Sequence, residues 1–528
     1  MNGVVDWLIL HSPALIIAIP LLGAFLTILI GKIGPRIRNV FVIIIMAITS
    51  FLILLLVNDV FTNGIRTYVF GGGSTSIESS YAIRILFEID GLNAFIAIIA
   101  AILPIVAIIY SWAFMKEHTG LDKYYTLILL MTAGMLGMIL TGDLFNFFVF
   151  LEITSIASAA LIAFYLDKQN SIQAAFKYIV ISAIGALFLL FAVALFYGQY
   201  NALNMAVIAN NISFTFIDKI ALVVLFAALA MKAGIVPMHM WLPDAYGRAP
   251  ASITVILIGT TLASLYGLFR VIFTIYGKYL FSFDSTQMAL TLGVLIIILA
   301  VVTIVIGVFM ALKQNDFKRM IAFAAIAEIG YMFLAVGAAL STYTFERGAA
   351  IISASGQMAL KGGIFHIFND ALDVGLLFLV AGAVYYAAKE TSLNKLGGLA
   401  RNMKYTTVFF LIGLAAVSGL PPMNGFASKL IIYQSMFQIN PLLTIVAILC
   451  SILLLAVFVK VFYSVFLGPK LPKFSGVKEV PKSMLIAMGI IASIIVFIGL
   501  FPNIFVENIV TPATNALQNA TSYIGGVL

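Results

Sequence analysis

Charged side chains occur inside apolar stretches of this sequence that water would not readily reach. Glu152 lies in the run TGDLFNFFVFLEITS, Lys232 in LVVLFAALAMKAGIVP and Lys429 in LPPMNGFASKLIIYQ. A charge at the centre of a bilayer costs about 2.5 to 3.5 kcal/mol on insertion scales, so such groups must be paired, hydrated or neutral. A carboxylate and an ammonium in that setting can exchange a proton, because their separation decides which protonation states are favoured.

We expect Glu152 and Lys232 to act as such a pair. At a separation of about 6 Å and an effective dielectric constant near 20, their attraction would be about 2.8 kcal/mol, enough to decide whether the lysine holds its proton. Moving the glutamate closer or further away would then load or unload that proton. A purely structural ion pair is the alternative for both Lys232 and Lys429, but each of these lysines lies beside a predicted helix break.

A second group of titratable residues lies in the run GQMALKGGIFHIFNDALDVGLLF. His366, Asp370 and Asp373 are spaced by four and three residues, so they share one face of a helix. A histidine beside carboxylates is suited to proton relay near neutral pH, whereas two carboxylates with freed carbonyls could instead hold Na⁺. Lys361 is a further candidate. The alternatives are a satisfied core histidine, helix-capping aspartates and a lysine that snorkels to the membrane interface.

Two other buried polar residues have simpler interpretations. Glu328, in the run MIAFAAIAEIGYM, is interpreted as a hydrogen-bonding partner in helix packing. The single cysteine, Cys450, is interpreted as a small core residue. With one cysteine and four scattered histidines, the sequence excludes a disulfide framework, a thiolate-held iron–sulfur cluster and haem pairs. We therefore expect no cofactor in this chain.

The elements that carry these residues are transmembrane helices. Of the 528 residues, 63% are hydrophobic and 9% are Asp, Glu, Lys or Arg, and the mean hydropathy is +1.14. A soluble domain carries about a quarter charged residues. Apolar runs of about 20 residues, enough to span a hydrocarbon layer about 30 Å thick, recur from end to end. The composition predicts an all-α polytopic membrane protein and argues against nucleic-acid binding and cytosolic catalysis.

We expect about fourteen spans, two of them broken. Their approximate limits are 13 to 31, 40 to 57, 93 to 114, 124 to 141, 144 to 166, 172 to 197, 218 to 249, 251 to 276, 287 to 312, 318 to 341, 357 to 387, 406 to 438, 442 to 467 and 484 to 501. Proline removes a backbone donor and clashes with the preceding turn, so Pro237 interrupts the seventh span, and Pro421 and Pro422 the twelfth. Paired interruptions are typical of inverted-repeat transporters with a midplane ion site. The breaks would free carbonyls that water or a lysine could satisfy.

The connections between the spans predict an orientation. An even number of spans places both termini on one face, and most of the 29 Lys and Arg residues then fall on the opposite face. By the positive-inside rule that basic face is cytoplasmic, and both termini lie outside. The stretch near 58–92, with β-rich runs around GGGSTS, is expected to form an external hairpin.

These segments resemble the antiporter-like subunits shared by Mrp-type Na⁺/H⁺ antiporters, respiratory complex I and the membrane-bound hydrogenases. The resemblance covers roughly residues 85 to 470 and rests, in order, on DGLNAF, TGDLFNFFVFLE, MKAGIVPMHMWLPDAYGRAP, NDFKRMIAFAAIAEIGYM, IFHIFNDAL and SGLPPMNGFASK. The segments DLFNFFVFLE and GFASK are most similar to those of the Mrp D-type subunit and its hydrogenase relatives.

The resemblance implies fourteen helices with two inverted five-helix repeats. The chain then divides into helices 1 to 3 at 1–123, a first repeat of helices 4 to 8 at 124–276, a second repeat of helices 9 to 13 at 287–467, and a basic cytoplasmic loop with the last helix at 468–528. It also implies the bilayer of a prokaryotic plasma membrane, and partner subunits in an Mrp-like or hydrogenase-like complex.

The implied function is proton translocation, with Na⁺ as an ion that could be exchanged. The implied relay runs from Glu152 and Lys232 through a group on helix 8, then His366, to Lys429. This sequence departs from that pattern, because helix 8 has no ionisable group before Arg270 and Val374 replaces a lysine found in many relatives. Waters held by hydroxyl side chains of helix 8 would be the substitute, namely Ser252, Thr254, Thr260, Thr261 and Ser264.

Two other functions are compatible with the same residues. The chain could be a self-sufficient secondary antiporter, or a structural subunit of a redox complex whose pump is disabled by the missing helix 8 lysine. No redox motif lies in this chain, so any electron transfer would belong to partner subunits. A hydrogenase, a quinone reductase, a sulfur-reducing complex and a plain Mrp antiporter are all compatible partners.

Overall fold

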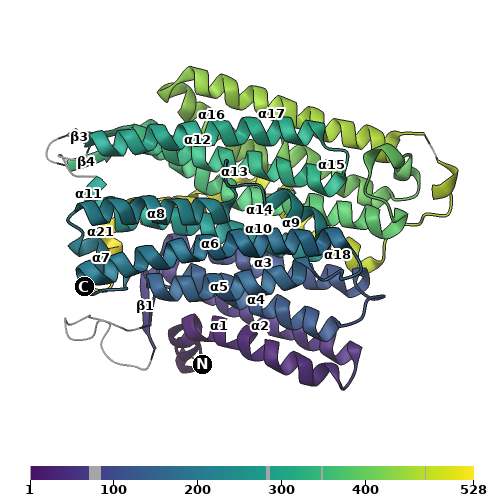
Figure 1. The fold of residues 1–528 in the computed structure, drawn as a ribbon, viewed down its shortest axis with the longest axis horizontal. Coiled ribbons are helices and arrows are strands. Elements are labelled where there is room, and N and C mark those ends of the chain that lie inside the picture. The colour runs from purple at the N-terminus through teal and green to yellow at the C-terminus, as the bar shows by residue number, and fades with distance from the viewer. Residues whose placement is uncertain (1, 71–84, 281–285, 347–348, 470) are drawn as a thin grey trace.

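The computed structural model describes residues 2–70, 85–280, 286–346, 349–469 and 471–528. Long helices lie side by side along one common direction (Figure 1). They are α1 Asn2–Gly31, α2 Pro35–Asn63, α3 Gly91–Phe114, α4 Leu121–Leu140, α5 Leu144–Ile162, α6 Gln169–Tyr200, α8 Phe216–Ala233, α10 Ala251–Arg270, α12 Thr286–Lys313, α13 Phe317–Ser341, α14 Ala354–Ala388, α15 Lys404–Val417, α16 Asn424–Ile439, α17 Pro441–Val461 and α18 Lys482–Leu500.

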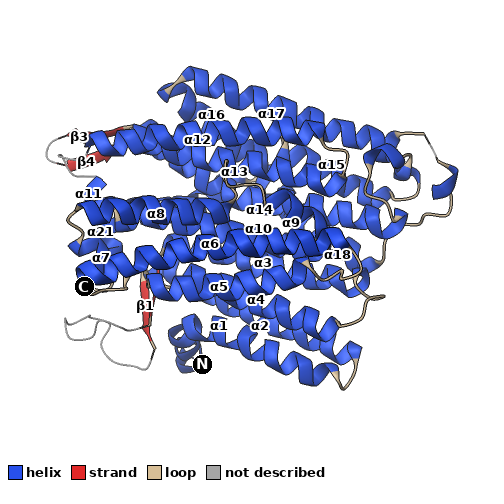
Figure 2. Cartoon of the chain, in the orientation of Figure 1, coloured by secondary structure: helices blue, strands red, loops and turns tan. Residues whose placement is uncertain are grey.

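Shorter elements join the long helices or follow them. The short helices are α7 Met205–Asn211, α9 Leu242–Arg248, α11 Gly277–Leu280, α19 Pro502–Phe505, α20 Thr511–Gln518 and α21 Ala520–Gly525. Within the described residues the strands are confined to two small antiparallel pairs, β1 Arg66–Val69 with β2 Leu86–Ile89 and β3 Tyr343–Glu346 with β4 Ala349–Ile352 (Figure 2). The all-α prediction is therefore confirmed.

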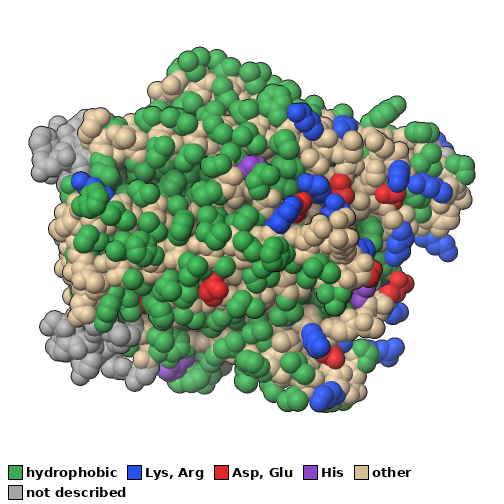
Figure 3. Space-filling model, viewed as in Figure 1, with side chains coloured by type: hydrophobic (Ala, Val, Ile, Leu, Met, Phe, Trp, Pro, Cys, Tyr) green, Lys and Arg blue, Asp and Glu red, His purple; other side chains and the backbone are tan. Residues whose placement is uncertain are grey.

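Twelve helices in the described residues are long and apolar enough to cross a membrane. They match the predicted spans except the seventh and twelfth, where the chain forms α8 followed by α9 and α15 followed by α16. The polytopic fold with two broken helices is thus present, while the count of fourteen crossings stays a prediction. Apolar side chains cover the middle of the visible face, and most of the Lys and Arg side chains seen on this face lie toward one end of the helices (Figure 3).

The helices differ in how deeply they lie inside the protein. All residues of α10 and nearly all residues of α13 are buried. In contrast, α1, α6, α12 and α17 expose large apolar side chains, for example Phe176 on α6 and Leu442 on α17. Apolar exposure of that extent is expected where side chains face lipid. Because α10 and α13 lie in the interior, their polar residues can contact the other helices but not the bilayer.

One local prediction needs correction, and two local features were not predicted. The predicted hairpin has paired strands, with Arg66 opposite Ile89, but α2 continues to Asn63, so the hairpin begins later than residue 58; its glycine cluster lies outside the described residues. The β3–β4 pair was not predicted, since each strand has only four residues. After α18 the chain forms three short helices, α19, α20 and α21, and α20 packs against α3.

A buried ion pair ties the start of α3 to the end of α10. The Arg270 guanidinium donates to both carboxylate oxygens of Asp90, at 2.8 and 2.7 Å, and its Nη2 also donates to Asn93 Oδ1 at 2.7 Å. Asp90 also caps α3 by accepting from the backbone N–H groups of Leu92 and Asn93. Both members of the pair are at least 98% buried, because Arg270 is 1% and Asp90 2% exposed.

Replacing Arg270 with methionine is expected to destabilise the protein strongly. Removal of one partner from a buried pair leaves an uncompensated charge and costs about 3 to 5 kcal/mol. The check is the melting temperature of the detergent-solubilised protein, with Arg36→Met as the control, because Arg36 is exposed. Equal melting temperatures for the two variants would contradict the importance of this pair.

Candidate functional site

The breaks in the two interrupted helices are formed by glycines in the left-handed conformation. Gly234 has φ +75° and ends α8, and a Cβ there would lie 2.6 Å from Leu242. Gly419 has φ +70° and follows the end of α15, and α16 begins at Asn424. Non-glycine residues rarely adopt this conformation, so glycine fixes where each helix stops. Lys232 lies in the last turn before the first break, and Lys429 in the helix after the second.

Lys232 is buried against α5. Its side chain is 7% exposed, and Nζ donates a hydrogen bond to Ser155 Oγ at 2.6 Å. Glu152 lies one helical turn before Ser155, within electrostatic range of the ammonium, but the two do not form an ion pair within the described chain. Glu152 Oε1 is buried and has no hydrogen-bond partner among the described residues. The structure therefore brings Glu152 and Lys232 to one site, with Ser155 as the direct contact.

A small polar cavity adjoins Lys232. Its volume is about 20 Å³, and its walls come from α4, α5, α6, α8, α10 and Trp241, with the lining residues Met138, Leu151, Thr154, Ser155, Tyr178, Lys232, Trp241, Thr260, Thr261 and Ser264. A cavity needs about 10 to 15 Å³ and several polar partners to hold a water molecule. The hydroxyls and the ammonium supply those partners, so this cavity is a site for one water. Of the five predicted helix 8 hydroxyls, Thr260, Thr261 and Ser264 face it.

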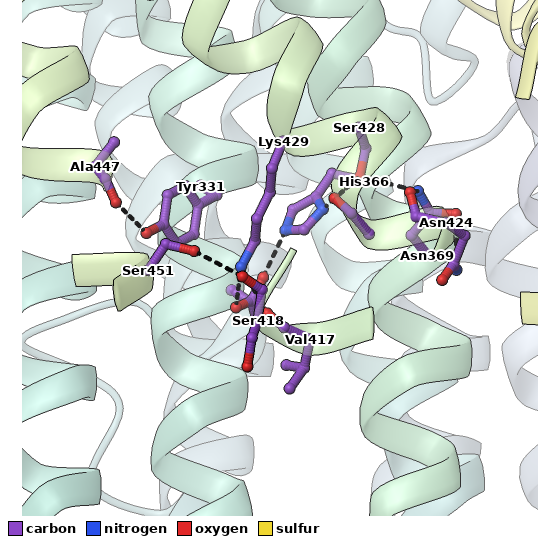
Figure 4. A network of polar contacts seen from close by, with 12 residues as sticks. Tyr331, His366, Asn369, Val417, Ser418, Asn424, Ser428, Lys429, Ala447 and Ser451 are labelled. Carbon is purple, nitrogen blue, oxygen red and sulfur yellow. Dashed lines mark hydrogen bonds and ion pairs between the residues drawn. The ribbon is translucent and has the colours of Figure 1, made fainter. Parts of the chain in front are cut away.

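The second site is built around one carboxylate. Glu328 Oε1 lies 2.7 Å from Lys429 Nζ, and Glu328 Oε2 lies 2.7 Å from His366 Nε2. Lys429 Nζ also donates to the Val417 carbonyl at 2.7 Å, which is one of the carbonyls left at the end of α15. The Lys429 ammonium lies 4.7 Å from the ring centroid of Tyr331, a favourable cation–π distance. Figure 4 shows Lys429, His366 and Tyr331 converging on this point.

A network of amides and hydroxyls fixes His366 in place. His366 Nδ1 lies 3.0 Å from Ser428 Oγ, and Asn369 Nδ2 donates to Ser428 Oγ and to the Asn424 carbonyl, each at 2.9 Å. These contacts join α14 to the first turns of α16 (Figure 4). When Nε2 donates to an ionised Glu328, Nδ1 is left to accept from the Ser428 hydroxyl, so the network selects one tautomer.

Glu328 is the residue that sequence interpretation undervalued. The sequence indicates a packing partner, whereas the structure makes it the carboxylate that both Lys429 and His366 contact. It is 1% exposed on α13, a helix that is buried over nearly all of its length. The signal was the same as for Glu152, a lone carboxylate in an apolar run, but nothing in the sequence showed which helices would pack against α13.

The two aspartates of α14 are buried near this network, and Asp373 interacts with Asn424. Asp370 is 3% and Asp373 1% exposed, and Oδ1 of each has no hydrogen-bond partner in the described part of the chain. A Cβ at Gly425 would lie 3.0 Å from Asp373 Oδ2, so this carboxylate borders the second break. The described residues form no cluster of three or more metal-ligating side chains, and Na⁺ binding near the aspartates stays a prediction.

The remaining lysines inside predicted spans lie elsewhere. Lys361 is half-buried on α14 and makes no hydrogen bond or ion pair with the described residues. Lys177 is largely exposed and pairs with Asp244 at 2.7 Å, and Lys460 donates to the carbonyls of Leu312 and Gln314 at the end of α12. Lys177 therefore neutralises Asp244, and Lys460 caps the end of α12.

A wider cavity lies at the start of α10, on the side of the break that faces the basic loops. It has a volume of about 370 Å³ and is lined in part by Lys168, Arg248 and Lys318. Lys318 is 7% exposed and donates a hydrogen bond to the Ala249 carbonyl. A hollow with three basic side chains favours water, so it brings solvent to the end of α9.

Comparisons with known proteins show the family to which this chain belongs. The family described as NADH:quinone oxidoreductase/Mrp antiporter, TM, matches residues 141–455, which is more than half of the chain and includes both buried lysines. The chain belongs to this family. It is 31% identical over 441 residues to NADH-quinone oxidoreductase subunit N of Desulforudis audaxviator, covering 80% of this chain and 83% of that protein.

Two further relatives place the chain across several branches of the family. It is 30% identical over 415 residues to the D-type component of the Na(+)/H(+) antiporter of Alkalihalophilus pseudofirmus, with 78% of each chain covered. Its structure superposes on a chain of the membrane-bound sulfane sulfur reductase, an archaeal respiratory membrane complex, with a TM-score of 0.83, 28% identity and coverage of 98% and 100%. Identities of 31% and 30% do not separate the N-type from the D-type branch.

Proposed function

We propose that this chain is a proton-translocating, antiporter-like subunit of a multisubunit membrane complex, with Na⁺ as an ion that could be exchanged. The observation that carries the proposal is the repetition of one arrangement, a buried lysine beside a helix break with a carboxylate from a neighbouring helix close by. In the first site these are Lys232 and Glu152, and in the second Lys429 and Glu328. Intramembrane ionisable groups of this kind mark ion pathways.

The second site can move a proton because the Glu328 carboxylate contacts two basic side chains, Lys429 and His366. One oxygen faces Lys429 and the other faces His366, each at 2.7 Å. The buried cluster avoids net charge when the carboxylate is balanced by a single cation, either Lys429 or His366. When a proton arrives on His366, the imidazolium balances the charge of Glu328 in place of Lys429. Lys429 then releases its own proton toward the second break. Reversal of these steps reloads Lys429.

The proposed setting follows from the relatives and from the distribution of charge. The relatives are subunits of an antiporter, a quinone oxidoreductase and a sulfane sulfur reductase complex, so we place other membrane subunits beside this chain and leave electron transfer to them. Both chain ends lie at the end of the helices opposite most Lys and Arg side chains (Figures 1 and 3). By the positive-inside rule the basic end is cytoplasmic and both termini are outside the plasma membrane of a prokaryote. We propose no cofactor in this chain.

The two alternative functions make different predictions. A self-sufficient antiporter would exchange ions without partners, and a structural subunit would not need intact buried charges. The complete Lys429–Glu328–His366 cluster favours an active pathway, because buried charges that serve no purpose are costly to retain.

Liposomes that contain the purified intact complex are expected to acidify or alkalinise when its driving reaction or a Na⁺ gradient is applied, as reported by a pH-sensitive dye. Liposomes that contain this chain alone are expected to show at most a small fraction of that signal. Equal exchange by the isolated chain would support the self-sufficient antiporter instead. Absence of proton movement in the intact, driven complex would contradict the proposal.

A further inference from the structure

The relay that the family resemblance implies lacks an ionisable group on α10. The structure offers a substitute on the short helix α9, which precedes α10. We propose that the hydroxyl of Tyr246, acting with Thr261, carries protons between the Lys232 cavity and Asp370 on α14. This inference rests on the proposed function and assigns residues to its central step. Its support comes from hydrogen bonds, a cavity and the ring contact between Tyr246 of α9 and Phe378 of α14.

No described residue of α10 near Lys232 can hold a charge. The ionisable residue of this helix is Arg270, at its last position, and its guanidinium is held by Asp90 and Asn93. Between the cavity and α14 the helix offers hydroxyl side chains and apolar side chains. A proton that crosses here must therefore pass along neutral hydrogen-bonding groups, each able to accept on one side and donate on the other.

Tyr246 extends the hydroxyl chain beyond the cavity. Thr261 lines the cavity that also holds the Lys232 ammonium, and Thr261 Oγ1 lies 2.7 Å from the hydroxyl of Tyr246. The Tyr246 hydroxyl also lies 3.2 Å from the Leu257 carbonyl, which gives its hydrogen a second acceptor. Tyr246 is 1% exposed, so water from bulk solvent does not compete for these bonds. A hydroxyl with two acceptors can turn between them, and such turning resets a chain after each proton.

The other side of Tyr246 faces α14. Its ring packs edge-on against Phe378, with a centroid distance of 5.7 Å, and the Asp370 carboxylate lies within electrostatic range of its hydroxyl. Asp370 is nine-tenths buried, and its Oδ1 has no hydrogen-bond partner among the described residues. One helical turn before Asp370 is His366, which contacts Glu328. Asp370 is thus an unused acceptor between the two sites.

The step is a proton transfer and needs no other reactant. The Lys232 ammonium gives a proton to the cavity water, and protons shift in turn along Thr261 and Tyr246, with one water closing the distance to Asp370. Lys232 ends as a neutral amine and Asp370 as a carboxylic acid, and each hydroxyl ends with one hydrogen as it began. The acid then passes its proton toward His366, which restores the carboxylate.

The test compares variants in the intact complex that differ by one hydroxyl group. Tyr246→Phe removes the proposed relay atom and keeps the ring. Tyr124→Phe is the matched control, since Tyr124 is also fully buried and its hydroxyl lies 2.7 Å from Ser252 on α10, away from the cavity. Thr261→Val removes the second hydroxyl, and Thr261→Ser restores it with a smaller side chain. Lys232→Met reports whether the proposed function holds at all.

We expect proton flux into liposomes to fall at least about tenfold in Tyr246→Phe and Thr261→Val, and to stay within about twofold of the unchanged complex in Tyr124→Phe and Thr261→Ser. Equal yields of assembled complex for all variants would show that the loss of flux is not a folding defect. Normal flux in Thr261→Ser would show that the hydroxyl of residue 261, and not the volume of its side chain, is required. Full flux in Tyr246→Phe alongside lost flux in Lys232→Met would overturn the Tyr246 relay and leave the proposed function standing. Full flux in both variants would overturn both.

Discussion

Glu328→Gln is expected to remove most of the proton transport of the intact complex. The substitution keeps the shape of the side chain but takes away the counter-ion that Lys429 and His366 share at 2.7 Å each. Glutamine carries no charge, so it cannot stabilise the protonated form of Lys429 or of His366, and we expect a loss of at least about a hundredfold in flux, the lower end of what a positioned proton-transfer group contributes. The measurement is dye-reported proton flux in liposomes that contain the complex.

The control for that experiment is Glu507→Gln, which neutralises an exposed glutamate on the same chain. It should leave flux unchanged, and both variants should be purified with the same set of partner subunits. Flux near the normal level in Glu328→Gln would mean that Glu328 is only a packing residue, as the sequence alone indicates.

Lys232→Met is expected to reduce proton flux by a similar factor. Lys232 is the basic residue at the first break, and its ammonium is the group that contacts both Ser155 and the one-water cavity. Methionine fills a similar volume but can neither hold nor pass a proton, so the first site would lose its carrier. Lys219→Met on the same helix is the control, because Lys219 is exposed. Unchanged flux in Lys232→Met would show that ions do not pass through the first site.

The overall organisation could be predicted because it depends on local features of the chain. Apolar runs of sufficient length define most spans, and Pro237, Pro421 and Pro422 indicated the two breaks, which the structure places at Gly234 and Gly419. Lys232 and Lys429 were identifiable because a charge in such a run is costly unless it is used or paired. These inferences need only the neighbouring sequence.

Contacts between distant segments could not be predicted in the same way. Glu328 and Lys429 are 101 residues apart and Asp90 and Arg270 are 180 apart, and nothing local indicates that these helices meet. The partner of Lys232 was expected to be Glu152, but its direct hydrogen bond goes to Ser155, which lies one helical turn further along α5. Tyr246 gave no signal of its own, since its role depends on Thr261 and on α14 packing beside it.

The most direct test of the account is the proton flux of four forms of the intact complex in liposomes: unchanged, Lys232→Met, Lys429→Met and both substitutions together. If the two lysines belong to one continuous pathway, either single substitution stops the flux, and the double variant is no worse than the single ones. If each single variant keeps about half of the flux and only the double variant loses it, the two sites work independently and the single relay proposed here is wrong.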